Sequence, residues 1–213
     1  MSKRLSVITW LMVFAVMFSI CSCSGTATVT ETETETEIEE TRPLDRLSEK
    51  TPENYKEFYA VLIGLIGKDE ASAEKELGEL FGGELTQTSE HKIGDVNTIH
   101  TYKVSITICE IEFSEIEVLI KEETGLVFKI NVTYYPETPN AGSEVYKAFK
   151  ESFEDIYGLK AEMNGGTWNG ISDQVAGYYP TDNVYLHVQL KTFGPNYAKK
   201  DFVEISVAQN VVL

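Results

Sequence analysis

The chain holds three histidines, and two of them could take part in binding a metal ion. His91 and His100 are nine residues apart and flank an expected turn at Gly94, so they could approach each other across a hairpin. A zinc site needs three or four ligands, and no third ligand of fixed spacing accompanies this pair. His187 lies in an alternating apolar pattern and is expected to face solvent from a strand. We therefore expect no metal site and no cofactor.

A hydrolase would need a nucleophile held beside a base, or two carboxylates flanking the bond that breaks. The chain has no Gly-x-Ser-x-Gly motif, and its 34 acidic residues make accidental carboxylate pairs common. The glycine-rich segment 164–170 lies between expected strands, so it does not open a helix that could bind phosphate. The sequence identifies no catalytic residue, although a hydrolase with a dispersed carboxylate and histidine site stays open as an alternative.

Aromatic side chains near expected loops are the other candidates for binding. Trp168 lies among turn-forming residues, and Tyr178, Tyr179 and Tyr197 lie in or beside other loops of the same part of the chain. Exposed aromatic rings often anchor sugars, peptides or proteins. The alternative is that Trp168 and one of each tyrosine pair pack in the core, as is common in a chain with 11 tyrosines. We take these four as candidate ligand-binding residues.

The amino-terminal segment has the pattern of an export signal. Lys3 and Arg4 precede an apolar run without charge over residues 5–20. This run of 16 residues is shorter than the roughly 20 that a helix needs to span a bilayer. We expect residues 1–22 to be a cleaved signal peptide. An ordinary signal peptide, cut after Ser22 or Ser24, is the alternative to the processing described next.

Cys23 ends a motif that indicates how this segment is processed. A branched apolar residue, Ile20, stands three positions before the cysteine, and a small residue, Ser22, stands directly before it. The motif resembles the lipobox of bacterial lipoproteins. The resemblance implies cleavage before Cys23 and attachment of acyl chains such as palmitate there, which would anchor the protein to the extracytoplasmic face of the cell membrane. Cys109 would then be the sole thiol of the body, and its apolar, strand-like surroundings predict a buried, unreactive side chain.

An acidic segment follows this cysteine. Threonine and glutamate alternate over residues 30–37, so apolar content is too low for folding and like charges repel one another. We expect residues 23–43 to form an extended tether. The whole chain has a formal net charge of -16, which disfavours nucleic acid as a partner. The expected partners are the membrane, reached through the lipid, and a protein, peptide or envelope glycan.

Periodic apolar residues predict three helices in the body. They recur at three- and four-residue steps in residues 53–66, 69–81 and 143–157. Thr51 or Pro52 opens the first helix and Gly67 closes it, while Asp69 has the position of an N-cap for the second. The short connection between these two helices predicts a helical hairpin.

The rest of the body alternates apolar and polar residues, which predicts strands. They are expected over residues 102–108, 116–120, 127–135, 159–163, 174–179, 184–191 and 202–208. Breaks are expected near Gly94, around Ser114 and Glu115, and before Gly125. These short connections indicate an antiparallel meander.

The two parts of this pattern are alike. Residues 116–121 parallel 186–191, and residues 127–132 parallel 202–207 at an offset of 75. We predict an α+β fold of two related halves, 44–135 and 136–213, each with a helix or helical hairpin packed on an antiparallel sheet of about four strands. Generic strand patterning can produce the same match, so the internal repeat stays a hypothesis.

The segment 66–69, leading into residues 77–78 and then the meander, resembles the β-lactamase-inhibitor-protein-like fold and small lipoproteins with helices on one face of a sheet. The resemblance implies a binding surface on the open sheet face, opposite the helices. The sequence therefore favours a non-enzymatic binding module. Its alternatives are an extracytoplasmic hydrolase or an accessory subunit of an envelope complex.

Overall fold

The computed structural model describes residues 47–81, 85–94 and 96–210. These residues belong to one compact unit, which spans residues 39–213. The expected signal peptide, Cys23 and the whole of the expected tether lie outside the described residues. Among the helices of the described ranges, none has the length and apolar character needed to cross a bilayer.

The described residues form an α+β fold, as predicted, with three helices and eight strands. The helices are α2 (Pro52–Leu65), α3 (Glu70–Phe81) and α4 (Pro139–Tyr157). The strands are β1 (Thr86–Ile93), β2 (Asn97–Ile108), β3 (Ile111–Lys121), β4 (Leu126–Tyr134), β5 (Glu162–Trp168), β6 (Ile171–Thr181), β7 (Val184–Phe193) and β8 (Phe202–Gln209). All eight lie in one antiparallel sheet, in the order β1-β2-β3-β4-β8-β7-β6-β5.

Strands β4 and β8 join the two meanders in the middle of this sheet. In their ladder Asn131 lies opposite Ser206, and apolar Val132 lies opposite Ile205. Each four-stranded meander would otherwise end in an unpaired edge, and the ladder gives each edge a partner. The chain therefore forms one continuous eight-stranded sheet where we expected a sheet of about four strands in each half.

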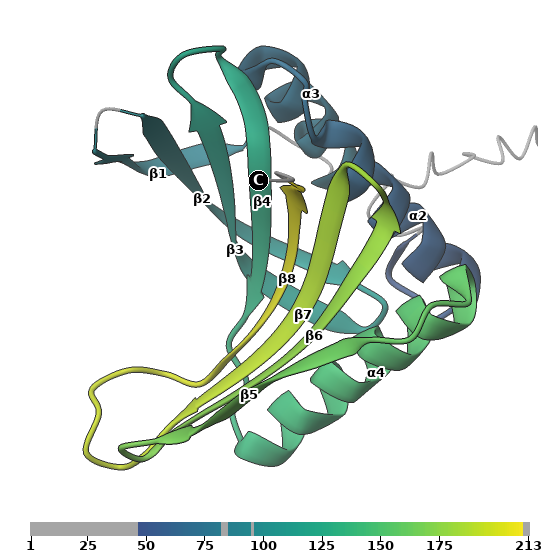
Figure 1. Ribbon diagram of the computed structural model, residues 1–213, viewed down its shortest axis with the longest axis vertical. Helices are drawn as coiled ribbons and strands as arrows, with labels where there is room; N and C mark the ends of the chain where they lie inside the picture. Colours follow the sequence, from purple (N-terminus) through teal and green to yellow (C-terminus); the bar gives the residue numbers. More distant parts are fainter. Residues whose placement is uncertain (1–46, 82–84, 95, 211–213) are drawn as a thin grey trace, which may run out of the picture. The chain divides into compact units, whose positions relative to one another are not determined.

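All three helices pack on the same face of the sheet (Figure 1). Aromatic rings fill the layer between the helices and the sheet. The ring centroids of Tyr59 on α2 and Phe153 on α4 are 5.1 Å apart, and those of Phe149 on α4 and Phe113 on β3 are 5.7 Å apart. All four of these side chains are fully buried. Burying each contributes about 1.5–3 kcal/mol to stability. The opposite face of the sheet carries no helix within the described ranges.

The helical hairpin follows from local capping, as predicted. The Thr51 side chain accepts a hydrogen bond from the Asn54 amide, and Pro52 occupies the first turn of α2. Gly67 adopts a φ of +84°, which favours glycine, and its amide donates to the Val127 carbonyl of β4. The Asp69 carboxylate accepts from the Ser72 amide at the start of α3.

Helix α4 begins at Pro139, four residues earlier than predicted. The Thr138 side chain accepts from the Ala141 amide at 3.2 Å, and the fixed φ of proline suits a first helical turn. Gly142 is part of the helix because it packs closely: a Cβ there would lie 3.1 Å from Pro136 and 3.2 Å from Leu190. The segment 136–142, expected as a joint between halves, is therefore largely helical.

Strand β3 runs through Ser114 and Glu115, where a break was expected. Val104 and Ser105 of β2 face the single residue Ser114 at this point, so the β-bulge lies in β2 and β3 continues without a break. The turn lies instead at Cys109 and Glu110, both with positive φ. Cys109 is therefore in a turn and not in a strand. It is fully buried, and its amide donates to the Leu47 carbonyl.

Two edge strands also differ from the prediction. Strand β1 is exposed along its whole length, so it lacks the apolar alternation that marks the inner strands. Strand β5 includes most of the glycine-rich segment expected as a loop, and only Asn169 and Gly170 form its turn to β6. Trp168 is consequently the last residue of a strand.

Candidate functional site

Polar side chains gather on the helix-free face of the sheet, around the β4–β8 ladder. Side chains alternate between the two faces along a strand. Ile130 and Val132 are buried beneath the helices, so Asn131 between them points to the other face. The same alternation and the pairing of neighbouring strands place five further polar residues beside it. We call these six residues the polar centre: Glu115, Glu117, Asn131, His187, Glu204 and Ser206.

Contacts within the polar centre link four strands. The Asn131 amide donates to Glu117 Oε2 at 2.9 Å, and His187 Nε2 lies 3.4 Å from Glu204 Oε1. The side chains of His187 and Glu204 are only 14% and 15% exposed, although no helix covers them. Asn131 Oδ1 and Ser206 Oγ are buried without a hydrogen-bond partner in the described part of the chain. The centre thus keeps hydrogen-bonding capacity that its own residues do not use.

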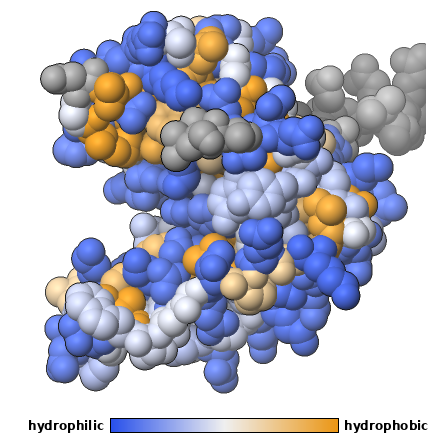
Figure 2. All heavy atoms as spheres, viewed as in Figure 1, coloured by the Kyte–Doolittle hydropathy of each residue, from blue (hydrophilic) through white to orange (hydrophobic). Residues whose placement is uncertain are grey.

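The electrostatic balance of the polar centre is acidic. Burial raises the pKa of Glu115, and the negative charges of Glu117 and Glu204 raise it further. A hydrogen bond from Tyr135 and the charge of Lys103 act in the opposite direction without cancelling the rise. Three carboxylates therefore share a half-buried site, and at Glu115 burial and the neighbouring carboxylates outweigh the positive charge of Lys103. In the space-filling view, the molecule is hollowed between the two parts of the sheet, and hydrophilic residues line the hollow (Figure 2).

The polar centre contains the residue types of a serine hydrolase but not their geometry. Ser206 pairs directly with His187 across the β7–β8 ladder, and His187 contacts Glu204. A nucleophilic serine must be hydrogen-bonded to its base and reachable by substrate. Ser206 is fully buried and its Oγ has no hydrogen-bond partner among the described residues. This arrangement does not activate a nucleophile, so it does not support the hydrolase alternative.

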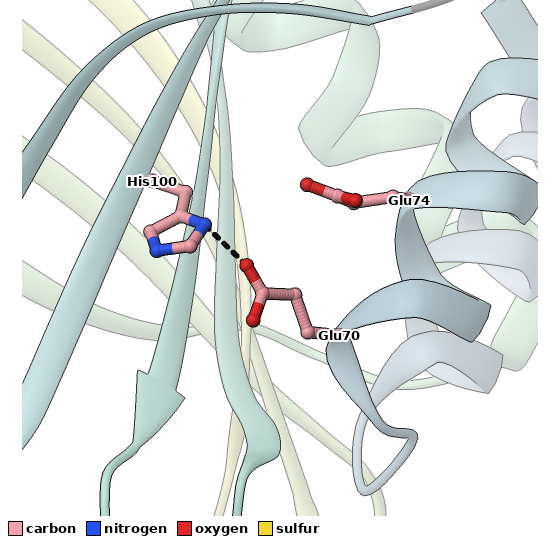
Figure 3. A group of neighbouring side chains, drawn as sticks. All are labelled: Glu70, Glu74 and His100. Carbon is pink, nitrogen blue, oxygen red and sulfur yellow. Dashed lines mark ion pairs between the residues drawn. The ribbon is translucent and has the colours of Figure 1, made fainter.

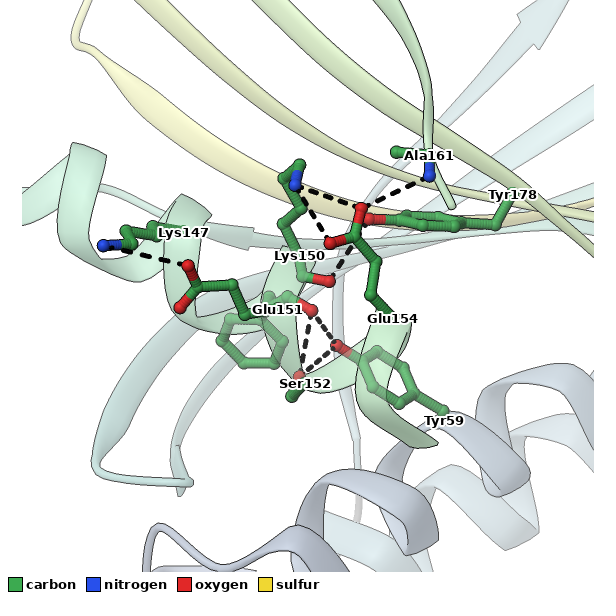
Figure 4. A network of polar contacts seen from close by, with 9 residues as sticks. Tyr59, Lys147, Lys150, Glu151, Ser152, Glu154, Ala161 and Tyr178 are labelled. Carbon is green, nitrogen blue, oxygen red and sulfur yellow. Dashed lines mark hydrogen bonds and ion pairs between the residues drawn. The ribbon is translucent and has the colours of Figure 1, made fainter. Parts of the chain in front are cut away.

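Tyr178, one of the four candidate aromatics, belongs to the core. It is 1% exposed, its ring lies 4.4 Å from that of Phe153, and its hydroxyl donates to the Lys150 carbonyl of α4 (Figure 4). Burial raises the pKa of this hydroxyl. In the same view, the hydroxyl of Tyr59 on α2 contacts Ser152 on α4. The two tyrosines therefore connect α4 to β6 and to α2. We correct the assignment of Tyr178, because its side chain is not part of an exposed aromatic surface that a ligand could reach.

The other three candidate aromatics lie at opposite ends of β6. Tyr179 is 47% exposed and lies 5.0 Å from the ring of Tyr185, which in turn lies 5.6 Å from His187. Tyr179 therefore borders the polar centre. Trp168 is 73% exposed beside the β5–β6 turn, where the Tyr197 hydroxyl donates to the Asn169 carbonyl. The structure brings Trp168 and Tyr197 to one turn but separates them from Tyr179, and a binding role for each stays a prediction.

A second cluster lies on the helical face and was not expected from the sequence. Glu70 and Glu74 of α3 face His100 of β2, and one ligand atom from each lies within 4.8 Å of the others (Figure 3). His91 is not part of it: it pairs with Ile99, one position from His100, and so points to the other face of the β1–β2 hairpin. The four-residue spacing of the two glutamates was the available signal, but their distance of about 30 residues from the histidine concealed the link.

Two further features carry less chemistry. An open cavity of about 540 Å³ lies between the start of α2 and α4 and is lined by charged and aliphatic groups without histidine or cysteine. The Cys109 thiol is buried, as predicted, and burial raises its pKa to about 12. A thiol that stays protonated at neutral pH is a poor nucleophile.

Comparison with protein-family models, with curated proteins and with solved structures finds no match to this chain. The function must therefore be argued from the geometry of the chain itself. Of the two clusters, the polar centre lies on the sheet face that no described helix covers, whereas the cluster around His100 lies between a helix and the sheet. A macromolecular partner could reach the former more readily.

Proposed function

We propose that this protein is a lipid-anchored extracytoplasmic binding protein that holds a basic side chain of a protein or peptide partner in its polar centre. The observation that carries this proposal is the group of half-buried carboxylates, Glu115, Glu117 and Glu204, on a sheet face without helices. Charges that have lost water need opposite charges nearby. A lysine or arginine from a partner would supply the positive charge that the centre lacks.

The surroundings of the polar centre favour a protein or peptide over a neutral glycan. Sugar hydroxyls can donate hydrogen bonds to carboxylates but cannot neutralise them. The rings of Tyr179 and Tyr185 border the centre, and an arginine side chain can stack on such rings while its guanidinium pairs with a carboxylate. The net charge of -16 would also attract basic partners over distance.

The proposed membrane anchor gives this surface its setting. Acyl chains on Cys23 would hold the protein at the membrane, and the acidic segment after it would act as a spacer. By its composition a segment of about 20 residues can extend to roughly 70 Å. The binding face could then reach partners well beyond the lipid headgroups.

We also propose that the parts 44–135 and 136–213 are related halves. The support comes from matching positions in the sheet. Glu117 pairs with Asn131 in the first part, and His187 pairs with Ser206 in the second. The two pairs meet because Asn131 itself pairs with Ser206, and the two residues differ in number by 75, the offset seen in the sequence. A polar residue from each part would thus lie on an approximate two-fold axis.

A peptide-binding measurement tests the proposed function. Full-length protein in detergent would be titrated with a peptide library that carries arginine, lysine or neutral citrulline at its centre. We expect basic peptides to bind more tightly, and Glu117→Gln or Glu204→Gln to weaken that binding about tenfold, the loss of one charge-assisted contact. Glu144→Gln is the matched control, since it removes an exposed charge from α4. Equal binding of arginine and citrulline peptides would reject the proposal.

The anchor is tested separately. Cells grown with a fatty acid analogue should label the wild-type protein and a Cys21→Ser variant to the same extent. A Cys23→Ser variant should lose the label, because the acceptor thiol is gone. Labelling that survives in Cys23→Ser would contradict the lipobox assignment and leave the binding proposal unaffected.

A further inference from the structure

The cluster on the helical face consists of two carboxylates and an imidazole that converge from α3 and β2. Glu70 and Glu74 are one helical turn apart, and both side chains extend toward the His100 ring (Figure 3). His100 Nδ1 lies 2.5 Å from Glu70 Oε1. The side chains come from elements that only the folded chain brings together, and they offer three ligand atoms of the types that bind transition metals.

The imidazole nitrogen that faces the carboxylates is buried and not hydrogen-bonded. His100 is 8% exposed, and its Nδ1 has no hydrogen-bond partner in the described ranges despite the short distance to Glu70. Nδ1 and Glu70 Oε1 are close together, but the plane of the imidazole ring does not point Nδ1 at that oxygen, so they form no hydrogen bond. A cation placed beside the line from Nδ1 to the Glu70 carboxylate could bind the nitrogen lone pair and both carboxylates. Zinc ions lie roughly 2.0–2.2 Å from such nitrogen and oxygen ligands.

The lysines of this part of the fold form ion pairs with carboxylates other than Glu70 and Glu74. Lys68 pairs with Glu76, Lys75 with Glu79 and Lys92 with Glu122. Two carboxylates one turn apart on a helix repel each other by about 0.2–0.5 kcal/mol. The side chains that β2 directs at Glu70 and Glu74 are the imidazole and the tyrosine described next, and neither carries a permanent positive charge.

Two of the three groups have outer contacts. The Tyr102 hydroxyl donates to Glu74, which fixes that carboxylate from β2. Nε2 of His100 faces Glu90 Oε2 at 3.9 Å. This distance is too long for a hydrogen bond, but the negative charge of Glu90 favours a proton on Nε2, which would leave the Nδ1 lone pair free to bind a metal. Metal-binding histidines are commonly oriented by such a carboxylate on the far nitrogen.

We propose that Glu70, Glu74 and His100 form a binding site for a divalent transition-metal ion of the Zn²⁺ class. Three protein ligands leave at least one coordination position for water. The ion would tie α3 to β2, on the opposite face of the sheet from the polar centre. The proposal is independent of the proposed function, because none of its residues belongs to that centre.

Calorimetric titration of the purified full-length protein with Zn²⁺ tests this site. We expect one ion per chain, no comparable binding of Mg²⁺, and an affinity at least about tenfold lower in His100→Gln and Glu74→Gln. His91→Gln is the matched control, because it removes an exposed histidine from the same hairpin. Failure of the wild-type chain to bind Zn²⁺, or unchanged binding in His100→Gln, would overturn the proposal.

Two further measurements establish whether the ion binds at these three residues. Co²⁺ absorption should lack a thiolate charge-transfer band, whereas binding at a cysteine thiol would show one and would contradict the assignment. Glu70→Gln changes a side chain that is 40% exposed, so this variant should fold normally by circular dichroism and still lose Zn²⁺ binding. Retained binding in this folded variant would also overturn the site.

Discussion

The two ends of the helical layer contact the sheet through corresponding tyrosines but neutralise their carboxylates differently. Tyr102 of β2 pairs with Ile116, and Tyr178 of β6 pairs with Leu186, which are the matching positions of the next strand. Both tyrosines are 1% exposed, and both hydroxyls reach a helix. The same kind of contact, a buried tyrosine of the sheet bonded to a helix, therefore occurs at both ends.

The difference lies in what surrounds each anchor. On α4, Lys150 and Glu154 form an ion pair at 3.0 Å, and the neighbouring position on β6 is Ala176. On α3 the corresponding i,i+4 pair is Glu70 and Glu74, and its neighbour on β2 is His100. The carboxylate of α4 is paired with a lysine, whereas the two carboxylates of α3 face an imidazole. The ion proposed above would supply the α3 end with the positive charge that Lys150 supplies to α4.

Truncating either tyrosine should remove what the two ends share. Tyr102→Ala and Tyr178→Ala each delete a fully buried ring, so each should lower the free energy of unfolding by about 3–5 kcal/mol. Urea denaturation at pH 7 measures this loss. A loss of under about 1 kcal/mol in one variant would show that this tyrosine is not a comparable anchor.

Removing only the hydroxyls should distinguish the two ends. The Tyr102 hydroxyl donates to the Glu74 carboxylate, whereas the Tyr178 hydroxyl donates to the Lys150 carbonyl and lies beside Glu154, a carboxylate that Lys150 already neutralises. Hydrogen bonds to charged groups contribute about 1.5–3 kcal/mol and neutral ones about 0.5–1.5 kcal/mol. Tyr102→Phe should therefore destabilise the protein more than Tyr178→Phe in the same urea measurement. The reverse order would argue that Glu74 is not held by Tyr102.

Breaking the ion pair on α4 should have a smaller effect. Lys150→Met leaves Glu154 without its cation, and the partly exposed pair is worth about 0.5–1 kcal/mol. The loss should diminish at high salt, since screening already weakens the pair. A loss that salt does not change would point to packing of the lysine stem as its cause.

Glu70→Lys should make the α3 end resemble the α4 end in charge. It gives α3 a lysine one turn before Glu74, in the same order as Lys150 and Glu154, and such a pair is worth about 0.3–0.5 kcal/mol. Glu70 lies in the first turn of α3, where the helix dipole favours an acid by about 0.3–1 kcal/mol, so the net effect on Tm should be small and not stabilising. Zn²⁺ should no longer shift the Tm. A Zn²⁺-dependent Tm in this variant would contradict the metal site.

The polar centre permits a comparison at pH 4 and pH 7. Burial, followed by the negative charge of Glu117, raises the pKa of Glu115 on β3. A raised carboxyl pKa means that folding favours the protonated form, so its stabilisation is lost as pH rises through the folded pKa. Glu115→Gln should therefore stabilise the protein at pH 7 and make little difference at pH 4. If Glu115→Gln changed the free energy of unfolding equally at pH 4 and pH 7, the protonation of Glu115 would not be the cause.

The sequence predicts those elements whose signals are local. The period of α2 and α3 and the Thr51 cap are predicted correctly because they depend on neighbours in the chain. The predicted start of α4 is too late, since Gly142 has the character of a helix breaker in the sequence but is a close packing position in the fold. Ser114 and Glu115 interrupt the apolar alternation as a turn would, but β3 continues through them and the irregularity of this ladder is a β-bulge in β2.

The candidate sites depend on information that periodicity does not contain. The polar centre forms only because β4 pairs with β8, and that pairing brings Asn131 to Ser206. His100 meets Glu70 through the packing of α3 on β2. Tyr178 and Tyr179 are adjacent in sequence, yet one is buried and the other exposed, because consecutive side chains of a strand face opposite ways.

The position of β8 also constrains how the sheet can be assembled. This strand follows the other seven in chain order but lies between β4 and β7 in the middle of the sheet. A chain interrupted before Phe202 would leave both of those strands with unpaired edges, which are the surfaces on which chains aggregate. Completion of the sheet must therefore wait for β8 to insert, and the pairing of residues about 75 apart makes that step slower than closure of the local hairpins.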